Sequence, residues 1–153
     1  MSDAIIGHGA ALTVNDGTST TTTGNIISIS GPNQTRDSID VSTMDSTSKQ
    51  REFLAGMLDA GELTAEMNYD GTALGTAHLL HILRTTELTY NGTTPSQTWK
   101  LQFYDRANTN QTHSYWQSAG FITALGHSIP FDDKVTQSVT IKFSGVPTYI
   151  DVG

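Results

Sequence analysis

The sequence contains no cysteine, few charged residues and no long apolar run. Without cysteine the fold has no disulfide and no thiolate metal ligand. No apolar stretch approaches the roughly 18 residues of a membrane-spanning helix. The first ten residues, MSDAIIGHGA, have neither the basic region nor the apolar core of a signal peptide. We therefore expect a protein that is made in a cytoplasm and has no membrane partner.

Positive charge is also scarce. Eight Lys and Arg stand against fifteen Asp and Glu, which gives a net charge of −7. Proteins that bind nucleic-acid backbones cluster their cations on one face, whereas the cations of this chain are scattered. The composition argues against such a protein. With 36% hydrophobic residues the chain can bury a core of its own, and we expect a single domain over residues 1–153.

The chain is rich in threonine, with 24 copies, and threonine favours strands. The stretch LDAGELTAEMNYDG at residues 58–71 alternates strictly between two sets of side chains. One set is Glu62, Thr64, Glu66 and Asn68, and the other is Leu63, Ala65, Met67 and Tyr69. A period of two is typical of an antiparallel sheet with one dry face and one wet face. The function of the chain depends on what the acidic, wet face meets.

Further strands are predicted where short β-rich patterns return. They cover residues 11–14, 87–90, 98–104, 113–129 and 135–143. A straight strand over 113–129 is too long for a domain of this size, so we expect a bend at Gly120 or Gly126 and a strand that serves two sheets. Residues 25–30 and 38–42 flank a Gly-Pro-Asn turn and are expected to form a hairpin.

Residues 43–59 lose this pattern and are predicted to be a long loop. Loops of this length in compact domains are usually functional or interacting. Four large apolar side chains in the loop need burial, which indicates a partner surface; they are Phe53, Leu54, Met57 and Leu58. Apolar residues at helical spacing predict a single helix from Thr72 to about Arg84. The expected fold is mainly β, a two-sheet antiparallel β-sandwich or open barrel with one flanking α-helix.

Carboxylate pairs do not predict an enzyme. On a strand, Glu62 and Glu66 are about 13 Å apart, beyond the separations that glycosidases use. A solvated acidic face is the simpler interpretation. Asp132 and Asp133 lie in a predicted turn, where Asp is favoured for local hydrogen bonding.

Histidines and aromatic residues allow two further readings. His78 and His81 have the spacing of two metal ligands on a helix, but no third ligand is evident, so packing or surface histidines are favoured. Four aromatic residues could form a sugar or peptide platform: Trp99, Tyr104, Tyr115 and Trp116. The alternation places Trp99 on a core face, which favours packing. We expect no catalytic residue, metal or cofactor.

The order of these features resembles the major tail tube protein of long-tailed bacteriophages. The segments that carry the resemblance are IISISGPNQTRDSIDVST, FLAGMLDAGELTAEMNYDG, the single helix and IPFDDKVTQSVTIKFSG. The most specific part is the combination of DSIDVST, GMLDAGEL and the Asp-rich turn and strand before SGVPTY. Nearly the whole chain is covered. Type VI secretion tube proteins have a similar fold, and we expect no C-terminal immunoglobulin-like domain of the kind that some tail tube proteins carry.

The resemblance implies hexameric rings in which each subunit gives strands to a continuous inner β-barrel. Stacked rings would form a tube in the virion tail, assembled in the host bacterial cytoplasm, through which DNA passes without specific binding. The implied partners are further copies of the chain, the tape-measure protein, the tail terminator and baseplate or initiator proteins. The runner-up hypothesis is a monomeric β-sandwich module that binds carbohydrate or peptide through Trp116 and Tyr115.

Two sets of residues would then have roles in the tube. We expect one set to face a negatively charged lumen: Glu62, Thr64, Glu66 and Asn68. We expect the second set to anchor the long loop on the next ring or on a neighbouring subunit: Phe53, Leu54, Met57 and Leu58.

Overall fold

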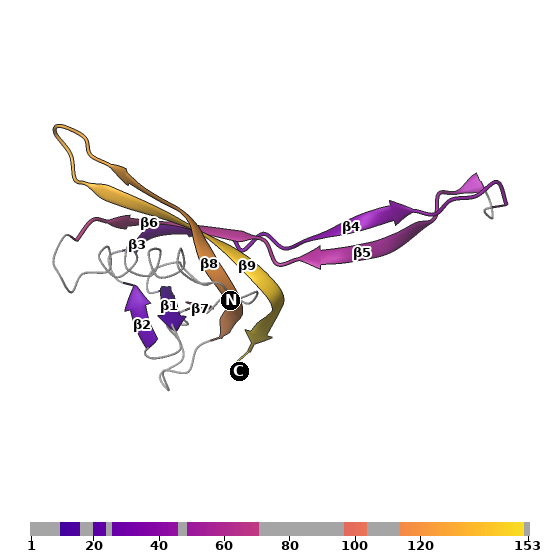
Figure 1. The fold of residues 1–153 in the computed structure, drawn as a ribbon, viewed down its shortest axis with the longest axis horizontal. Coiled ribbons are helices and arrows are strands. Elements are labelled where there is room, and N and C mark those ends of the chain that lie inside the picture. The colour runs from indigo at the N-terminus through magenta and orange to yellow at the C-terminus, as the bar shows by residue number, and fades with distance from the viewer. Residues whose placement is uncertain are drawn as a thin grey trace, which may run out of the picture.

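The computed structural model describes residues 10–15, 20–23, 26–45, 49–70, 97–103 and 114–151. Within these residues almost all regular structure is β (Figure 1). The strands are β1 (Ala11–Asn15), β2 (Thr20–Thr23), β3 (Ile26–Ser30), β4 (Thr35–Asp40), β5 (Phe53–Asp59), β6 (Glu62–Asn68), β7 (Gln97–Gln102), β8 (Tyr115–Ser128) and β9 (Thr136–Ile150).

Seven of these strands form one antiparallel sheet in the order β2-β1-β7-β8-β9-β6-β3, and β4 and β5 form a second, two-stranded sheet. The large sheet is curled, and the long β8–β9 hairpin runs through both of its halves (Figure 1). The first part of β8 pairs with β7, whereas the first part of β9 pairs with β6. We call β3, β6 and residues 136–143 and 121–128 of β9 and β8 the wall.

The bend in β8 comes from two irregularities in its pairing with β9. The register shifts between Gln117 and Ala119 and again between Ile122 and Ala124. Such bulges bend a strand and increase its twist. They flank Gly120, one of the two positions at which the sequence predicts a bend, and Gly120 is buried against Phe143 and Lys142. The predicted bend is therefore confirmed at Gly120, but the prediction that the strand serves two sheets is wrong, because β8 lies within one curled sheet.

One face of the large sheet carries the core. On β6, Leu63, Ala65 and Met67 are buried and the residues between them are exposed, as the alternation predicts. The other core residues are Leu12, Val14, Ala60, Trp99, Leu101, Trp116, Ile122, Val139, Ile141 and Phe143. The Trp116 and Phe143 rings meet edge to face with centroids 4.5 Å apart. Burial of each large apolar side chain contributes about 1.5–3 kcal/mol, so this face holds the two halves together.

The predicted hairpin between residues 25–30 and 38–42 is wrong. β3 pairs with β6, and β4 pairs with β5. The four strands make one long hairpin whose two sides are β3–β4 and β5–β6, interrupted at residues 31–34 and 60–61. The Gly-Pro-Asn turn kinks one side of this hairpin and does not reverse the chain. The Asn33 amide donates to the Glu62 carbonyl across the kink at 3.4 Å.

The predicted loop over residues 43–59 is also wrong in its second half, since Phe53–Asp59 is strand β5. This strand is exposed on both sides except at Gly56. A strand with no dry face shows no alternation, which is why its sequence does not read as a strand. We call residues 35–45 and 49–59 the arm, which stands out from the body of the molecule (Figure 1). The predicted helix at 72–84 and strand at 87–90 lie outside the described residues.

Gly61 sits at the kink between the arm and the wall with φ of +82°, and a Cβ there would collide with the backbone carbonyl of Asn33. We expect Gly61→Ala to destabilise the fold by about 2–4 kcal/mol, because left-handed strain and a backbone clash add. Gly145→Ala is the matched control, since Gly145 has φ of +86° but open space around it. Denaturant unfolding should show that Gly145→Ala lowers the free energy of unfolding by only about 1 kcal/mol. Equal losses for the two variants would contradict a clash at Gly61.

Candidate functional site

The first candidate surface is the face of the wall that points away from the core. The four residues expected in a lumen all lie on this face and are exposed: Glu62, Thr64, Glu66 and Asn68. Neighbouring strands extend the face with hydroxyl groups. The residues opposite are Lys142, Thr140, Ser138 and Thr136 on β9, and Ser30 and Ser28 on β3. We call this surface the wall face; it is polar, rich in hydroxyl groups and at least three strands wide.

The charge of the wall face is negative. Lys142 stands opposite Glu62 in the register, but its Nζ bonds the carboxylate of Asp59 at 3.0 and 3.1 Å. This region therefore has three carboxylates, those of Asp59, Glu62 and Glu66, and one ammonium group, which contacts only Asp59. The strand spacing between Glu62 and Glu66, about 13 Å, keeps them too far apart for paired acid–base work.

Asp59 fixes the point at which the arm leaves the wall. Its Oδ1 accepts a hydrogen bond from the Gly61 amide at 2.8 Å, in addition to the contacts with Lys142. The Gly61 amide first, and Lys142 second, hold the pKa of the Asp59 carboxyl below its usual range. The ion pair is open to solvent, which screens its energy.

The second candidate surface is the arm. Its four predicted partner residues are open to solvent, with exposed fractions of 57% for Phe53, 59% for Leu54, 87% for Met57 and 47% for Leu58. Further large apolar side chains, those of Ile39, Val41 and Met44, are also exposed. A two-stranded ribbon on its own is marginally stable in water. An exposed apolar surface of this extent is typical of a contact with another macromolecule.

The distal part of the arm is held by hydrogen bonds that continue the β4–β5 ladder. The Val41 amide donates to the Glu52 carbonyl at 2.9 Å, and the Glu52 amide donates to Ser42 Oγ at 2.8 Å. The Ser42 amide donates to the Asp40 carboxylate at 2.9 Å. The hydrogen bonds that Ser42 makes to the Asp40 carboxylate lower the pKa of Asp40. The arm is therefore an ordered ribbon beyond the ends of its strands.

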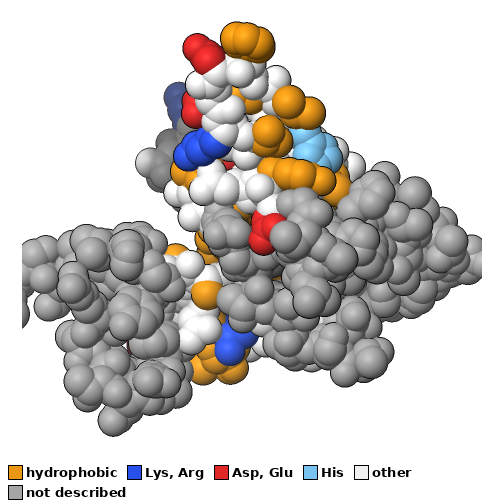
Figure 2. Space-filling model, turned by 90° about the vertical axis from the view of Figure 1, so that its left-hand side faces the viewer, with side chains coloured by type: hydrophobic (Ala, Val, Ile, Leu, Met, Phe, Trp, Pro, Cys, Tyr) orange, Lys and Arg blue, Asp and Glu red, His pale blue; other side chains and the backbone are white. Residues whose placement is uncertain are grey.

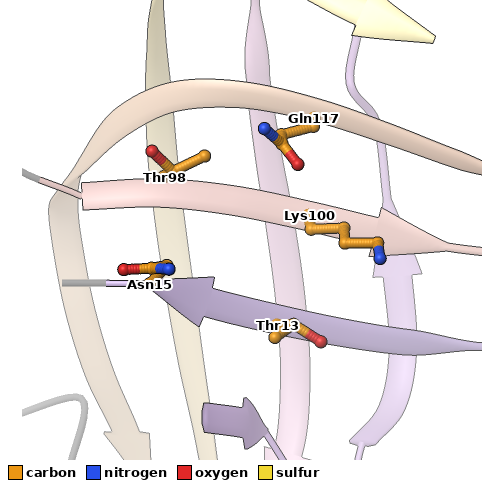
Figure 3. Close-up of a pocket in the computed structure, with 5 residues that line it drawn as sticks. All are labelled: Thr13, Asn15, Thr98, Lys100 and Gln117. Atoms are coloured by element: carbon orange, nitrogen blue, oxygen red, sulfur yellow. The ribbon is translucent and has the colours of Figure 1, made fainter. Parts of the chain in front are cut away.

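A shallow hollow of about 320 Å³ lies on the other half of the sheet (Figure 3). Side chains of β1, β7 and β8 line it: Thr13, Asn15, Thr98, Lys100 and Gln117. These side chains are hydroxyls, amides and one ammonium group. Lys100 Nζ stands 3.9 Å from the centre of the Tyr115 ring. Among the described residues that line it there is neither a carboxylate nor an imidazole, the usual general bases.

The aromatic residues of the binding-module hypothesis do not form an open platform. Trp99 is fully buried, which confirms its predicted place in the core. Trp116 is 6% exposed and packs on Phe143. Tyr115 lies under Lys100, and Tyr104 is outside the described residues. The described residues therefore offer this alternative no exposed tryptophan.

The histidines give no metal site in the part of the chain that the structure describes. His127 meets the Tyr69 ring edge to face, with centroids 5.4 Å apart, and lies 3.4 Å from Gln137 Nε2. His78 and His81 fall outside the described residues. Among the described residues, no three His, Cys, Asp or Glu side chains converge as metal ligands would.

A polar wall and an apolar arm are features of a protein that assembles, and comparison with known families decides which kind. Residues 13–150 match the family described as "Lambda phage tail tube protein, TTP". The chain belongs to this family. Tail tube proteins are structural subunits and not enzymes, so this tail tube protein is a structural component of the tail of a phage-like particle. The family expected from the sequence motifs is confirmed.

Solved structures with the same fold also come from tubes and injection machines. The tail of an empty GTA particle with C6 symmetry aligns with a TM-score of 0.66 and 14% identity over 96% of this chain and 99% of that one. A chain of the anti-feeding prophage baseplate aligns with a TM-score of 0.72 and 11% identity over 99% of this chain and 98% of that one. A chain of the PVC sheath–tube complex in its extended state aligns with a TM-score of 0.69 and 14% identity over 98% of this chain and 95% of that one. Among curated proteins, none matches this sequence.

One exposed apolar group, in the turn between β8 and β9, was not predicted from the sequence. Ile129 and Phe131 stand in the turn between β8 and β9, with 77% and 106% of their surface exposed. The segment IPFDDK reads as an Asp-rich turn, and the two large apolar residues on either side of its proline are the indication of an exposed apolar group.

The described residues include no helix that is long and apolar enough to cross a membrane.

Acid should weaken the junction between the arm and the wall. The folded-state pKa of Asp59 lies below its unfolded value. The contacts of the ionised Asp59 therefore contribute fully to the stability of the junction above about pH 4, and this contribution is lost as the pH falls through the folded-state pKa. Carbon NMR of the Asp59 carboxyl, at concentrations too low for assembly, measures this pKa. We expect Lys142→Gln to raise it only part of the way, because the Gly61 hydrogen bond remains. Lys134→Gln is the control; an Asp59 pKa that ignored Lys142→Gln would contradict this account.

Proposed function

We propose that this tail tube protein forms hexameric rings that stack into a hollow conduit for the genome. The observation that carries the proposal is the wall, a set of strands with a core behind it, a polar face in front and, among the described residues, β3 as its outermost strand on one side. The fold is shared with tubes from six-fold symmetric particles, which supports six as the number of subunits.

The open edges of the wall suggest how a ring closes. Within the described residues β3 pairs only with β6, and residues 124–128 of β8 pair only with β9. Unpaired edges invite association with another chain. Pairing of the β3 edge of one subunit with the β8 edge of the next would join the walls of all subunits into one inner barrel. Ring closure then removes both edges at once.

In such a barrel the wall face points into the lumen, since the core covers the other side. Glu62, Thr64, Glu66 and Asn68 would line the channel together with the hydroxyl groups of β3 and β9. Six copies at −7 give a charge of −42 for each ring. A negative wall repels phosphate groups, so DNA passes without binding.

The arm would join one ring to the next. Phe53, Leu54, Met57 and Leu58 are the anchors that we propose for this contact, because their exposed area is large and central to the ribbon. The ends of the tube would be met by the tape-measure protein inside and by terminator and baseplate or initiator proteins outside. Structures with the same fold include a tube-terminating cap and a baseplate. Assembly would take place in the cytoplasm of the bacterial host.

Replacement of an arm anchor should prevent stacking without unfolding the subunit. We expect Met57→Asp to raise the protein concentration needed for tubes by about tenfold or more, because it places a charge in an apolar contact. Negative-stain electron microscopy across a concentration series counts rings and tubes, and circular dichroism checks the fold. Val146→Asp is the matched control, since Val146 is 89% exposed but lies far along β9. Wild-type protein that stays monomeric at every concentration would count against the proposed function.

Reversal of charge on the wall face should slow the passage of DNA. We expect Glu62→Lys with Glu66→Lys to assemble into tails that release DNA more slowly, and the delay should shrink as salt rises. Triggered release from particles, followed with a DNA-binding dye, measures the rate. Thr98→Lys with Gln117→Lys adds lysines on the other half of the sheet and should leave the rate unchanged. Normal release by assembled Glu62→Lys, Glu66→Lys particles would refute the lumen assignment.

A further inference from the structure

The wall has a different apolar element at each of its two ends. The arm leaves at the end where Glu62 pairs with Lys142. The β8–β9 turn, residues 129–135, leaves at the opposite end, where Asn68 pairs with Thr136. In Figure 1 the arm extends to the right and the β8–β9 turn lies at the upper left. Two unlike surfaces at opposite ends of one wall are the geometry that a head-to-tail contact requires.

The β8–β9 end carries three exposed apolar side chains, which we call the tip patch: Tyr69, Ile129 and Phe131. Tyr69 is 45% exposed and its ring contacts His127, while Phe131 is fully exposed. Figure 2 looks onto this end and shows hydrophobic side chains gathered with a few charged ones. A fully exposed Phe contributes nothing to the core, and aromatic residues in such positions are typical anchors of interfaces.

The charges around the two apolar surfaces can pair. Asp132 and Asp133 follow Phe131 directly, and both are exposed. On the distal arm the exposed cations Lys49 and Arg51 lie close to Phe53 in sequence, with the exposed Glu52 between Arg51 and Phe53. An apolar centre with opposite charges at its rim is the usual composition of a protein interface.

We propose that the arm of one copy docks on the tip patch of a copy in the adjoining ring, with Lys49 and Arg51 beside Asp132 and Asp133. This inference rests on the proposed tube and names both surfaces of its ring-to-ring contact. Met57 and Phe53 of the arm would cover Phe131 and Ile129 of the next copy. The occupant of the tip patch is therefore a second copy of this chain.

The absence of cysteine allows a direct test, because any disulfide must join introduced residues. Arm variants with a single cysteine (Phe53→Cys, Leu54→Cys or Met57→Cys) are mixed with Phe131→Cys or Ile129→Cys under mild oxidation. A disulfide requires Cα atoms within about 7 Å. We expect cross-linked pairs in at least one arm–tip combination within assembled tubes. Mixtures of Val146→Cys with Phe131→Cys are the matched control and should not cross-link.

Tubes that form but give no arm–tip disulfide in any combination would overturn this contact and leave the proposed function standing. Protein that makes neither rings nor tubes would overturn the proposed function and this inference with it. Electron microscopy of the same samples separates the two results.

Charge exchange gives a second test that does not depend on the register of the contact. Lys49→Asp with Arg51→Asp, and Asp132→Lys with Asp133→Lys, should each lower the yield of tubes by about tenfold, because like charges then meet. An equimolar mixture of the two variants should recover the wild-type yield to within about twofold, because an arm of either variant meets an opposite charge on a tip of the other and assembly then favours alternation of the two variants. Mixtures no better than the separate variants would contradict the pairing.

Discussion

The backbone ladder between β8 and β9 is the interaction on which the remaining structure depends. These strands pair from Ser128–Thr136 to Tyr115–Ile150, and each gives a different part of its length to a different half of the sheet. Because the two bulges bend the hairpin, one ladder supports two surfaces that face in different directions. The core lies in the fold of this bend, where Trp116 meets Phe143. The wall face and the hollow of the other half are thus consequences of a single curved hairpin.

How much of this could be predicted from the sequence depends on where water is excluded. The alternation over residues 62–68 predicts β6 correctly because Leu63, Ala65 and Met67 are buried and their neighbours are not. The same argument fails for β5, whose two faces are both exposed. Pairing of β3 with β6, across more than thirty residues of chain, is a non-local choice that turn residues cannot reveal. The bend at Gly120 was predictable from strand length, but its mechanism, two shifts of register, was not.

The candidate surfaces follow the same division. The β6 part of the wall face was predictable, since one strand carries its four residues at a period of two. The residues that β3 and β9 add to this face were not, because they depend on non-local strand pairing. The apolar residues of the arm were predictable as unburied groups, although their strand was not. Ile129 and Phe131 were missed because a turn has no periodicity against which an outward apolar residue stands out. The family could be predicted from the order of several motifs along the chain, and the family match over residues 13–150 agrees with that prediction.

The two ends of the wall also differ in what a finished tube would present. A stack built from unlike ends has a direction, so one terminus would display a circle of bare arms and the other a circle of bare tips. A protein that seals the first terminus would have to imitate a tip, whereas a protein that starts or seals the second would have to imitate an arm. One chain would thereby present two different binding surfaces, one at each terminus of the tube.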